Sequence, residues 1–430
     1  MKRKSKLISL VLTVAVMSSM FVGCGGKNDV TSSDTSKDTI NLTLWEHESN
    51  YAKADKEVIK LFEEKHPNIK IEVVDKGTQY DTLLSTAIQA GDAPDIFWTN
   101  GNKDTRLSSI VKIGGAMDLT DKIDISQYDP MAKSVLYLKD ESGNKKLYCT
   151  PGSTIDTRAV FYHKDIFDKY GIKVPNNLAE FEAACETLKK NGVTPITLMA
   201  KTSWDILFTL EPIMAAVAPD WLDDAAAGKA NVNDPRVIKA FNKMKEWMDK
   251  GYFSANGLGS DGNAGLLNFS KQNTAMIIAG SWVVTDISKN NPKVQLGAFQ
   301  MPMENNGKAS VIGYSVGWAG YAKTKHPEEV LEYLKFVTTL EAQTVFANTL
   351  NGIPSLKGIE AKDQITKDMA TADKRVDSFY SIIGYRPKDD TSPRKLWEDD
   401  STKWIGGKMT AEDLIKEIDA AQDYTKKIDN

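Results

Sequence analysis

Residues 40–47 read Ile-Asn-Leu-Thr-Leu-Trp-Glu-His, and the apolar and polar side chains alternate here as they do along a half-buried β-strand. Residues 51–65 then place apolar side chains at helical spacing. His66-Pro67-Asn68 ends this helix, because proline disfavours helical backbone in the residue before it. Residues 69–74 return to a strand pattern. We therefore predict the order strand, helix, strand.

The alternation continues along the chain. Residues 80–90 have a helical pattern, 91–94 read Gly-Asp-Ala-Pro and form a turn, and Asp95-Ile96-Phe97-Trp98 is a short buried strand. Strands that alternate with helices favour a parallel sheet with helices on both faces. We therefore predict an α/β fold. In open α/β sheets, ligands bind beyond the carboxyl ends of the strands, and 45–47 and 98–101 lie at those ends.

Length and composition narrow the class of protein. The chain has 430 residues, 41% of them hydrophobic and 26% charged, which is ordinary for a globular protein. This excludes a disordered, collagen-like or disulfide-scaffold chain, and a chain of this length normally divides into more than one compact unit. With 58 acidic and 54 basic residues, the net charge of −4 argues against a general nucleic-acid binder.

The amino-terminal residues have the pattern of a secretion signal. A cationic head, 2–6, precedes the uncharged run 7–22, which is too short to span a bilayer comfortably. Phe21-Val22-Gly23-Cys24 resembles a bacterial lipobox, which implies that residues 1–23 are removed and that a lipid is attached to Cys24. Residues 24–38 are polar and predict a flexible tether. The alternative is a plain signal peptide with an incidental cysteine.

The prediction for location follows from this segment. No later stretch is long and apolar enough to cross a membrane, so we predict a protein tethered by its lipid at the extracellular face of the cell membrane. Cys149 and Cys185 then remain in the mature chain. They could pair in an oxidising compartment, but we favour two separate buried thiols.

The sequence contains no recognisable catalytic or metal-binding motif. None of the four histidines has a second histidine at metal-ligand spacing. No phosphate-loop motif is present in the sequence. Residues 313–317 and 257–262 match the letters of the Gly-x-Ser-x-Gly and Gly-x-Gly-x-x-Gly patterns, but neither follows a predicted strand, as a nucleophile elbow or a dinucleotide-binding loop must. We therefore predict no enzyme activity, no cofactor and no metal. A glycosidase pair of carboxylates remains open, because acidic residues are abundant.

Tryptophan usage gives the strongest indication of a ligand. Trp221 and Trp247 lie in helical patterns and are predicted to be core. Four others follow strands or turns: Trp45, Trp98, Trp204 and Trp282. An indole ring offers a flat apolar face and one N–H donor, and a sugar ring offers an apolar C–H face and a hydroxyl rim. Their recurrence at strand ends predicts a sugar-binding cleft.

Several segments, in order, resemble the bacterial extracellular solute-binding proteins of the carbohydrate (maltose-binding-like) family, the substrate-binding lipoproteins of ABC importers. The resemblance covers nearly the whole mature chain. The matching segments are Phe62 to Ile71, Ala90 to Phe97, Tyr148 to Asp165, Gly171 to Phe181, Met276 to Val283, Gly317 to Lys335 and Gly352-Ile353-Pro354.

The resemblance implies a two-lobe periplasmic-binding-protein-like fold of class II type. The first lobe would comprise 38–150 plus 316–355, and the second 151–315 plus 356–430. The ligand would lie in the cleft between them, and the lobes would close on it like a hinged clamp. The implied partners are a carbohydrate ligand and the transmembrane subunits of an ABC permease, with the binding protein itself a monomer.

Site residues follow from the same resemblance. Trp282 matches the family tryptophan that commonly stacks on sugar, and Asp156 matches the position of a sugar-binding glutamate. The remaining candidates come from strand ends, loops, the late crossing and the final segment: Trp98, Asn100, Trp45, Glu46, His47, Trp204, Tyr314, Trp318, Gln79, Tyr80, Arg386 and Trp397.

The predicted function is that of an extracellular sugar receptor, with an oligosaccharide as ligand, that delivers this ligand to an importer by hinge closure. Two alternatives remain open. One is a receptor for a non-sugar solute, for which Arg158 and Arg386 leave room for an anion. The other is a secreted glycoside-acting enzyme with carboxylates such as Glu46 and Asp156.

Overall fold

The computed structural model describes residues 39–103, 105–128, 132–133, 135–140, 142–388, 392–426 and 428. The compact unit of the chain is Thr39–Asn430. The predicted signal at 1–23, the tether at 24–38 and the lipid site Cys24 lie outside the described residues. Among the described residues, no helix is long and apolar enough to cross a membrane.

A four-stranded sheet with the order β12-β3-β1-β2 forms the first lobe. β1 (Ile40–Glu46) is parallel to both β2 (Ile69–Asp75) and β3 (Ile96–Trp98). The predicted alternation of strands and helices over 40–98 is confirmed. β12 (Trp318–Gly320) returns from late in the chain and pairs antiparallel with β3, so one edge of the sheet departs from the predicted parallel order.

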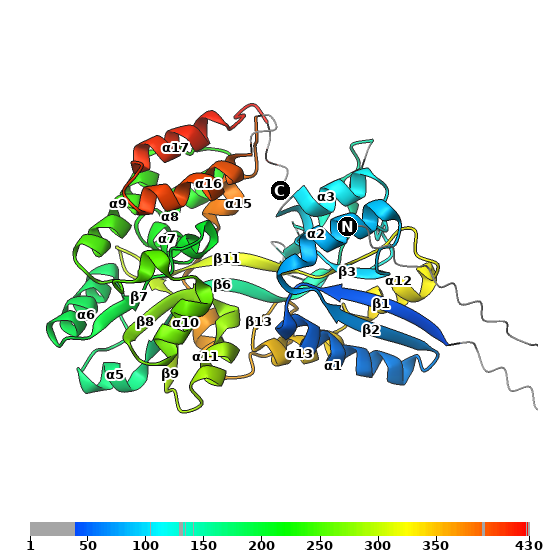
Figure 1. The fold of residues 1–430 in the computed structure, drawn as a ribbon, viewed down its shortest axis with the longest axis horizontal. Coiled ribbons are helices and arrows are strands. Elements are labelled where there is room, and N and C mark those ends of the chain that lie inside the picture. The colour runs from blue at the N-terminus through cyan, green and yellow to red at the C-terminus, as the bar shows by residue number, and fades with distance from the viewer. Residues whose placement is uncertain are drawn as a thin grey trace, which may run out of the picture. The chain divides into compact units, whose positions relative to one another are not determined.

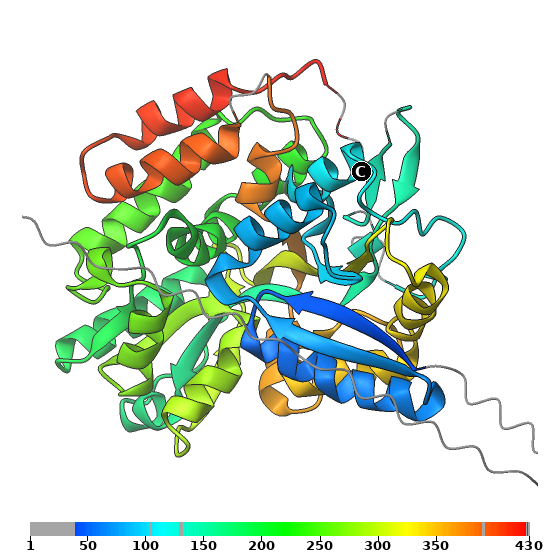
Figure 2. The same ribbon diagram turned by 45° about the vertical axis from the view of Figure 1, so that its right-hand side comes forward.

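Amphipathic helices pack against this sheet. In α1 (Ser49–Lys65), Ala54, Val58 and Phe62 recur every four residues and are buried, as expected for one apolar stripe facing the core. The other elements of the first lobe are α2 (Tyr80–Ala90), η1 (Gly77–Gln79), η2 (Gly101–Lys103), α3 (Thr105–Lys112), β4 (Tyr137–Lys139), β5 (Lys145–Leu147), α12 (Pro327–Phe336) and α13 (Leu340–Leu350). α1 and α13 lie side by side in Figures 1 and 2.

An eight-stranded mixed sheet forms the second lobe. Its longest strand, β6 (Pro151–His163), pairs antiparallel with β8 (Thr274–Gly280), β9 (Leu296–Phe299), β11 (Lys308–Val316) and β13 (Ile353–Pro354). Among the strands that the structure describes in this sheet, β7–β8 and β11–β14 are the parallel pairs. The parallel pattern of the amino-terminal segment therefore does not extend to this lobe.

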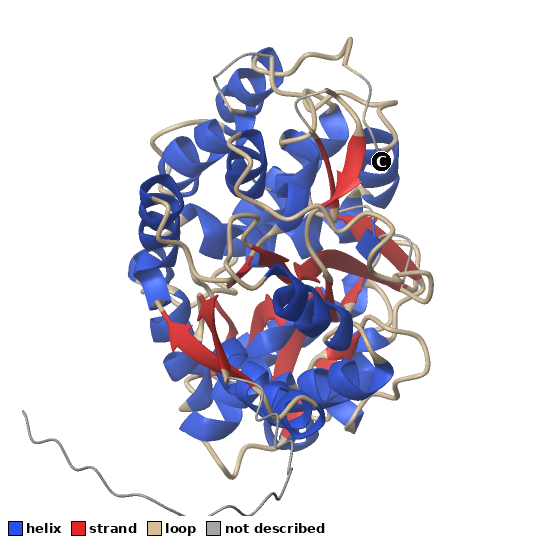
Figure 3. Ribbon diagram, turned by 90° about the vertical axis from the view of Figure 1, so that its right-hand side faces the viewer, coloured by secondary structure: helices blue, strands red, loops and turns tan. Residues whose placement is uncertain are grey.

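Helices surround the strands of both sheets (Figure 3). The remaining strands of the second lobe are β7 (Thr194–Thr197), β10 (Met301–Pro302) and β14 (Lys374–Asp377). Its helices are α5 (Lys164–Lys169), α6 (Leu178–Lys190), α7 (Ser203–Val217), α8 (Pro219–Ala226), α9 (Pro235–Asp249), η3 (Gly257–Gly259), α10 (Gly262–Ser270), η4 (Ser281–Val283), α11 (Val284–Asn290), α14 (Gln364–Ala370), α15 (Phe379–Ile383), α16 (Pro393–Ile405) and α17 (Ala411–Ala420).

Each lobe has its own hydrophobic core. The first draws on 42–149 and 316–356, and the main core of the second draws on 160–418. Trp221 and Trp247 are fully buried in the second core, as predicted. Cys149 is buried in the first core and Cys185 in the second, and no disulfide joins them, which confirms the prediction of two separate thiols.

Two long strands, β6 and β11, are among the segments that carry the chain between the lobes. β6 and β11 run antiparallel beside each other and extend from the second sheet toward the first (Figure 1). At the crossing, the backbone of Thr150 bonds to both neighbours: its N–H donates to the Trp318 carbonyl at 2.9 Å, and its carbonyl accepts from the Gly317 N–H at 3.0 Å. The Thr150 hydroxyl also accepts from the Trp318 N–H at 2.9 Å.

This close approach requires a glycine at 317. A Cβ atom at Gly317 would lie 2.1 Å from the Thr150 Oγ1 atom and 2.7 Å from the Pro151 carbonyl oxygen. Both distances are far below van der Waals contact, so any side chain at this position must push the two crossing segments apart. The lobes are therefore joined at a point where backbone packs directly on backbone.

We expect Gly317→Ala to destabilise the protein by about 2 kcal/mol, as overpacking of a tight site commonly does. The measurement is the urea midpoint of unfolding. Gly259→Ala is the matched control, since a Cβ at Gly259 meets no atom within 4 Å. Equal midpoints for the two variants would show that the crossing is not tightly packed.

Candidate functional site

Alternate residues of β6 form the floor of the candidate site. Side chains two residues apart on a strand share one face of the sheet, so Thr154, Asp156 and Arg158 point the same way. Gly313 of β11 lies opposite Asp156 and contributes no side chain above the sheet. Because β6 joins the two lobes, this row of polar groups runs from one lobe toward the other.

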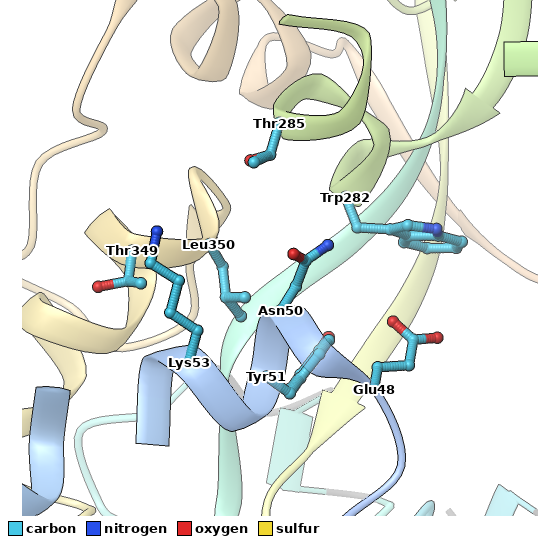
Figure 4. Close-up of a pocket in the computed structure, with 8 residues that line it drawn as sticks. All are labelled: Glu48, Asn50, Tyr51, Lys53, Trp282, Thr285, Thr349 and Leu350. Carbon is cyan, nitrogen blue, oxygen red and sulfur yellow. The ribbon is translucent and has the colours of Figure 1, made fainter. Parts of the chain in front are cut away.

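A small pocket with a cavity volume of about 30 Å³ lies between elements of the two lobes (Figure 4). α1 and the residue before it supply one wall, η4 and α11 a second, and the end of α13 a third. The lining residues are Glu48, Asn50, Tyr51, Lys53, Trp282, Thr285, Thr349 and Leu350.

Tyr51 brings the first lobe to the floor of the site. Its hydroxyl is hydrogen-bonded to Thr154 of β6. Burial raises the pKa of Tyr51 well above its ordinary value, and the negative charges of Asp156, Glu48 and Glu46 raise it further. The phenol is therefore a neutral hydroxyl at physiological pH. The carboxylates that act on it converge on this part of the site.

Trp282 forms the opposite wall. Its indole lies flat against Gly280, where a Cβ atom would stand 2.2 to 2.4 Å from three atoms of the ring. The strand β8 ends at Gly280, and η4 begins at Ser281, so the turn delivers the ring directly beyond a strand end. The side chain is partly exposed. In Figure 4, Glu48 and Asn50 extend toward it from the α1 side.

Other aromatic side chains of the second lobe continue from Trp282. Phe208 on α7 packs edge-on against Trp282, with ring centroids 5.5 Å apart, and against Trp204 at 5.8 Å. Tyr380 on α15 packs edge-on against Trp204 at 5.5 Å. Trp204 is 45% exposed, which is unusual for so large an apolar side chain. These four rings are here called the aromatic row; Trp204, Trp282 and Tyr380 are partly exposed and could face a flat ligand, whereas Phe208 is buried between the two tryptophans.

The first lobe contributes a second stacked group. The His47 ring lies parallel to Trp98, with centroids 3.5 Å apart and planes 16° from parallel. Its Nδ1 atom lies 2.8 Å from the Glu46 Oε2 atom, which also accepts the His47 backbone N–H at 2.9 Å. The Tyr51 ring lies 5.1 Å away. His47 is thus held in one orientation beside the pocket residue Tyr51.

A pair of buried carboxyl groups lies beneath His47. Glu46 and Asp55 are both fully buried and lie close enough for their charges to interact. Burial raises the pKa of Glu46, against the lowering effect of its hydrogen bond with His47. Burial also raises the pKa of Asp55 well above its ordinary value, and the charge of Glu46 raises it further. Two carboxylates offer each other no donor, so a shared proton satisfies the pair.

The structure brings together several predicted site residues. Trp282 lines the pocket, and Asp156 and Trp204 lie in the same lobe. His47 lies beside Tyr51, and Trp98 is 8% exposed in the first core, stacked against His47. Asn100 is half-buried just beyond Trp98. Gln79 is exposed at the start of α2. Trp45 is half-buried under the Lys76 ammonium group, 3.9 Å from its ring centroid. Tyr314 lies on β11 opposite Ile155; its side chain is outside the described residues.

Two residues that we predicted to contact the ligand, Glu46 and Tyr80, are instead buried inside the first lobe. Glu46 shares a face of β1 with Leu42 and Leu44 and points into the core, where its carboxyl pairs with Asp55. Tyr80 is 2% exposed and donates its hydroxyl to the Trp98 carbonyl. Their side chains are occupied inside the first lobe, so we no longer place them at the ligand.

Three further residues that we predicted to contact the ligand are also buried: Trp318, Trp397 and Arg386. Trp318 is 1% exposed in the first core, and Trp397 is fully buried in the second, where its indole donates to the Ser203 carbonyl. Arg386 is buried and stacks on Tyr424 at 4.7 Å. Each makes its contacts within one lobe, and none lines the pocket.

Sequence reasoning missed several residues of the site. Asn50 and Tyr51 lie in the first turn of α1, and the sequence analysis treated this segment only as a helix. Phe208 lies inside α7, a helix rich in apolar residues, so nothing in the sequence distinguished it from a core residue. The position of α1 immediately after the carboxyl end of β1 was the available signal, since ligand edges in α/β sheets include the first turn of the following helix.

The arrangement suits a ligand with flat apolar faces and many hydroxyl groups. Aromatic rings stack on such faces, while Glu48, Asn50, Lys53, Thr285 and Thr349 supply polar atoms around the pocket. In the part of the chain that the structure describes, no group of three or more histidine, cysteine, aspartate or glutamate side chains could hold a metal ion.

Comparisons with known proteins agree with this geometry. A family model described as "Bacterial extracellular solute-binding protein" matches residues 45–344. A "Multiple sugar-binding protein" of Streptococcus mutans is 25% identical over 88% of this chain and 89% of its own length. A "Melibiose/raffinose/stachyose-binding protein" of Bacillus subtilis is 22% identical over 98% of this chain and 95% of its own.

Solved structures show the same fold. A "Chitin oligosaccharide binding protein" superposes with a TM-score of 0.72 at 24% identity, over 89% of this chain and 98% of its own. A sugar transporter from Bacillus licheniformis in complex with stachyose superposes with a TM-score of 0.66 at 19% identity, over 89% and 99%. The predicted two-lobe α/β fold is therefore confirmed.

We expect Asp55→Asn to stabilise the protein increasingly as pH rises. The pKa of Asp55 is raised in the folded state. Its contribution to the free energy of unfolding is therefore complete below the pKa of the unfolded state, about 4, and is lost as pH rises through the pKa of the folded state. Asparagine removes that loss and donates to Glu46. Each unit by which folding raises the pKa changes the free energy of unfolding by about 1.4 kcal/mol.

The measurement is the free energy of unfolding of both proteins in urea at several pH values, from about 4 to about 8, the range above the ordinary pKa of aspartate. The difference in favour of the variant should grow across this range. A constant difference, or one that falls with pH, would contradict a proton held between Glu46 and Asp55.

Proposed function

Because the chain belongs to the bacterial extracellular solute-binding proteins, we propose that it is a receptor for an oligosaccharide, which it delivers to an ABC importer. One observation carries this proposal. A partly exposed indole, Trp282, faces the polar side chains Glu48 and Asn50 across a pocket whose walls come from both lobes. Stacking on one side and hydrogen bonding on the other suit a sugar ring.

The relatives support an oligosaccharide in particular. Their names refer to multiple sugars, to melibiose, raffinose and stachyose, and to chitin oligosaccharide. In this chain, the aromatic row extends beyond Trp282 to Trp204, so more than one ring face is available. A ligand with several linked sugar rings would use these faces together.

Ligand binding between the lobes would drive their closure. A ligand shifts such an equilibrium only by its differential affinity for the closed form. Contacts made by Trp282 from one lobe and Tyr51 from the other provide that difference, because a single sugar can touch both only when the walls are near. The closed form would then be recognised by the transmembrane subunits of the importer.

The rest of the predicted organisation belongs to this proposal. The lobes would comprise 38–150 plus 316–355 and 151–315 plus 356–430. The mature protein would be a monomer, anchored through a lipid on Cys24 at the extracellular face of the membrane. It would bind its ligand unchanged, without enzyme activity.

The charges around the site favour a neutral sugar over an anion. The Arg158 guanidinium is buried beside Glu211, with Nε and Oε2 3.3 Å apart, and Arg106 is paired with Asp81 at 2.5 Å. Of the charged side chains that line the pocket, Lys53 is basic and Glu48 acidic. An anionic solute would therefore meet few uncommitted positive charges. The enzyme alternative loses support because Glu46 is buried against Asp55.

We expect one class of oligosaccharide to raise the melting temperature of the protein in a panel that includes raffinose, stachyose and chitin oligosaccharides. A ligand that binds only the folded state at 100 times Kd stabilises it by about 2.7 kcal/mol. Trp282→Ala should weaken binding of the active sugar by about 2 kcal/mol, or roughly thirtyfold in Kd, since buried tryptophans commonly dominate binding.

Tyr170→Ala is the matched control, because Tyr170 is a half-buried aromatic residue packed on the second core away from the pocket. It should leave Kd unchanged. The proposal would be contradicted if no sugar raised the melting temperature but a non-sugar solute did. Shorter products after incubation with an oligosaccharide would instead favour the enzyme.

A further inference from the structure

We propose that Arg158 is a positioning residue that fixes the aromatic row of the second lobe. Its guanidinium carbon lies 5.2 Å from the ring centroid of Phe208, 5.8 Å from that of Trp204 and 5.9 Å from that of Trp282. The side chain is only 4% exposed. One buried cation thus lies within reach of three rings at once.

These rings come from separate parts of the chain. Trp204 and Phe208 lie one turn apart on α7, whereas Trp282 lies on η4, and Arg158 reaches them all from β6. A cation near an aromatic face is attracted by the ring quadrupole, more strongly when it is shielded from water. The flat guanidinium also stacks on rings, which an ammonium group cannot do. Arg158 therefore ties the two ring-bearing elements to the strand on which the site is built.

Glu211, the acidic partner of Arg158, connects this residue to Tyr380, the fourth ring of the aromatic row. Glu211 on α7 is 1% exposed, and its Oε2 atom lies 3.3 Å from the Arg158 Nε atom. Neither atom has a hydrogen-bonding partner among the described residues, so no directed hydrogen bond fixes this pair. The other oxygen of Glu211 accepts the Tyr380 backbone N–H at 3.1 Å, and the Tyr380 ring packs on Trp204.

Burial gives this pair little freedom to rearrange. Burial raises the pKa of Glu211, and the charge of Arg158 acts against that increase. Space for the guanidinium exists because residue 313 is a glycine: a Cβ atom there would stand 3.2 Å from the Arg158 Nη1 atom. Strand β11, helix α7 and the aromatic row thus all confine Arg158 to one position.

The consequence for binding rests on the proposed function. If the aromatic row stacks on linked sugar rings, the relative angles of Trp204 and Trp282 determine which ligands fit. Arg158 is too deeply buried to touch the ligand itself. It would act on affinity through the rings, by holding them in the orientation that the ligand needs.

The test uses 19F NMR of the protein labelled with 5-fluorotryptophan, whose lines are assigned with Trp204→Phe and Trp282→Phe. Arg158→Lys keeps a positive charge beside Glu211 but loses the planar group. We expect the Trp204 and Trp282 lines to broaden or split in this variant, while those of the core residues Trp221 and Trp247 stay single and sharp. Arg236→Lys is the control, because Arg236 forms ion pairs with Asp224 and Asp234 on the surface of the second lobe.

A second variant removes both charges. Arg158→Gln with Glu211→Gln leaves no buried ion unpaired and should broaden the same two lines further. A charge effect alone would move a line without splitting or broadening it. Single, sharp Trp204 and Trp282 lines in Arg158→Lys would overturn the proposal, whether or not the double variant folds.

Binding gives the second readout. With raffinose or stachyose as probe, Arg158→Lys should raise Kd about threefold to tenfold, the range that corresponds to the loss of cation–π contacts. If the unmodified protein binds no sugar, the proposed function fails, but the NMR result still decides the role of Arg158. If sugar binds and Kd does not change while the lines broaden, the positioning role stands and its effect on affinity is refuted.

Discussion

The pairing of β6 with β11 is the constraint on which the rest of the structure depends. β6 is thirteen residues long, continues from the lobe crossing at Thr150 and pairs with four strands of the second sheet, β8, β9, β11 and β13. Its register places Thr154, Asp156 and Arg158 on one face. The same strand therefore joins the lobes, forms the floor of the site and anchors the aromatic row, so a shift in register would disturb all three.

The site combines stacking surfaces with charges that are mostly neutralised. Arg158 lies beside Glu211, burial next to Glu46 raises the pKa of Asp55, and the Tyr51 phenol stays neutral. Such a site suits the proposed neutral polyhydroxylated ligand, which would be held by aromatic faces and directed hydrogen bonds rather than by net charge. Burying these ionisable groups is costly unless each is paired, and the pairing also fixes the groups that face the pocket.

Much of the fold could be predicted from periodicity. The strands and helices of 40–98 were readable because each buries one face, and Trp282 was identified because it follows a strand and a glycine. The site was harder to predict. Trp318 and Trp397 resemble ligand tryptophans in sequence but lie in cores formed by distant segments. The alternation of Leu42, Leu44 and Glu46 could have indicated that Glu46 points inward. Phe208 and Tyr380 join the site only through long-range packing, which one sequence does not reveal.

The central claim is that a sugar binds between the two lobes and touches both. Backbone hydrogen exchange measures this most directly, with the sugar that gives the largest thermal shift present or omitted. The account predicts slower exchange at the amino-terminal turn of α1, around Asn50 and Tyr51, and at 281–285 around Trp282 in the same experiment. Protection confined to one lobe, or found away from both segments, would contradict it.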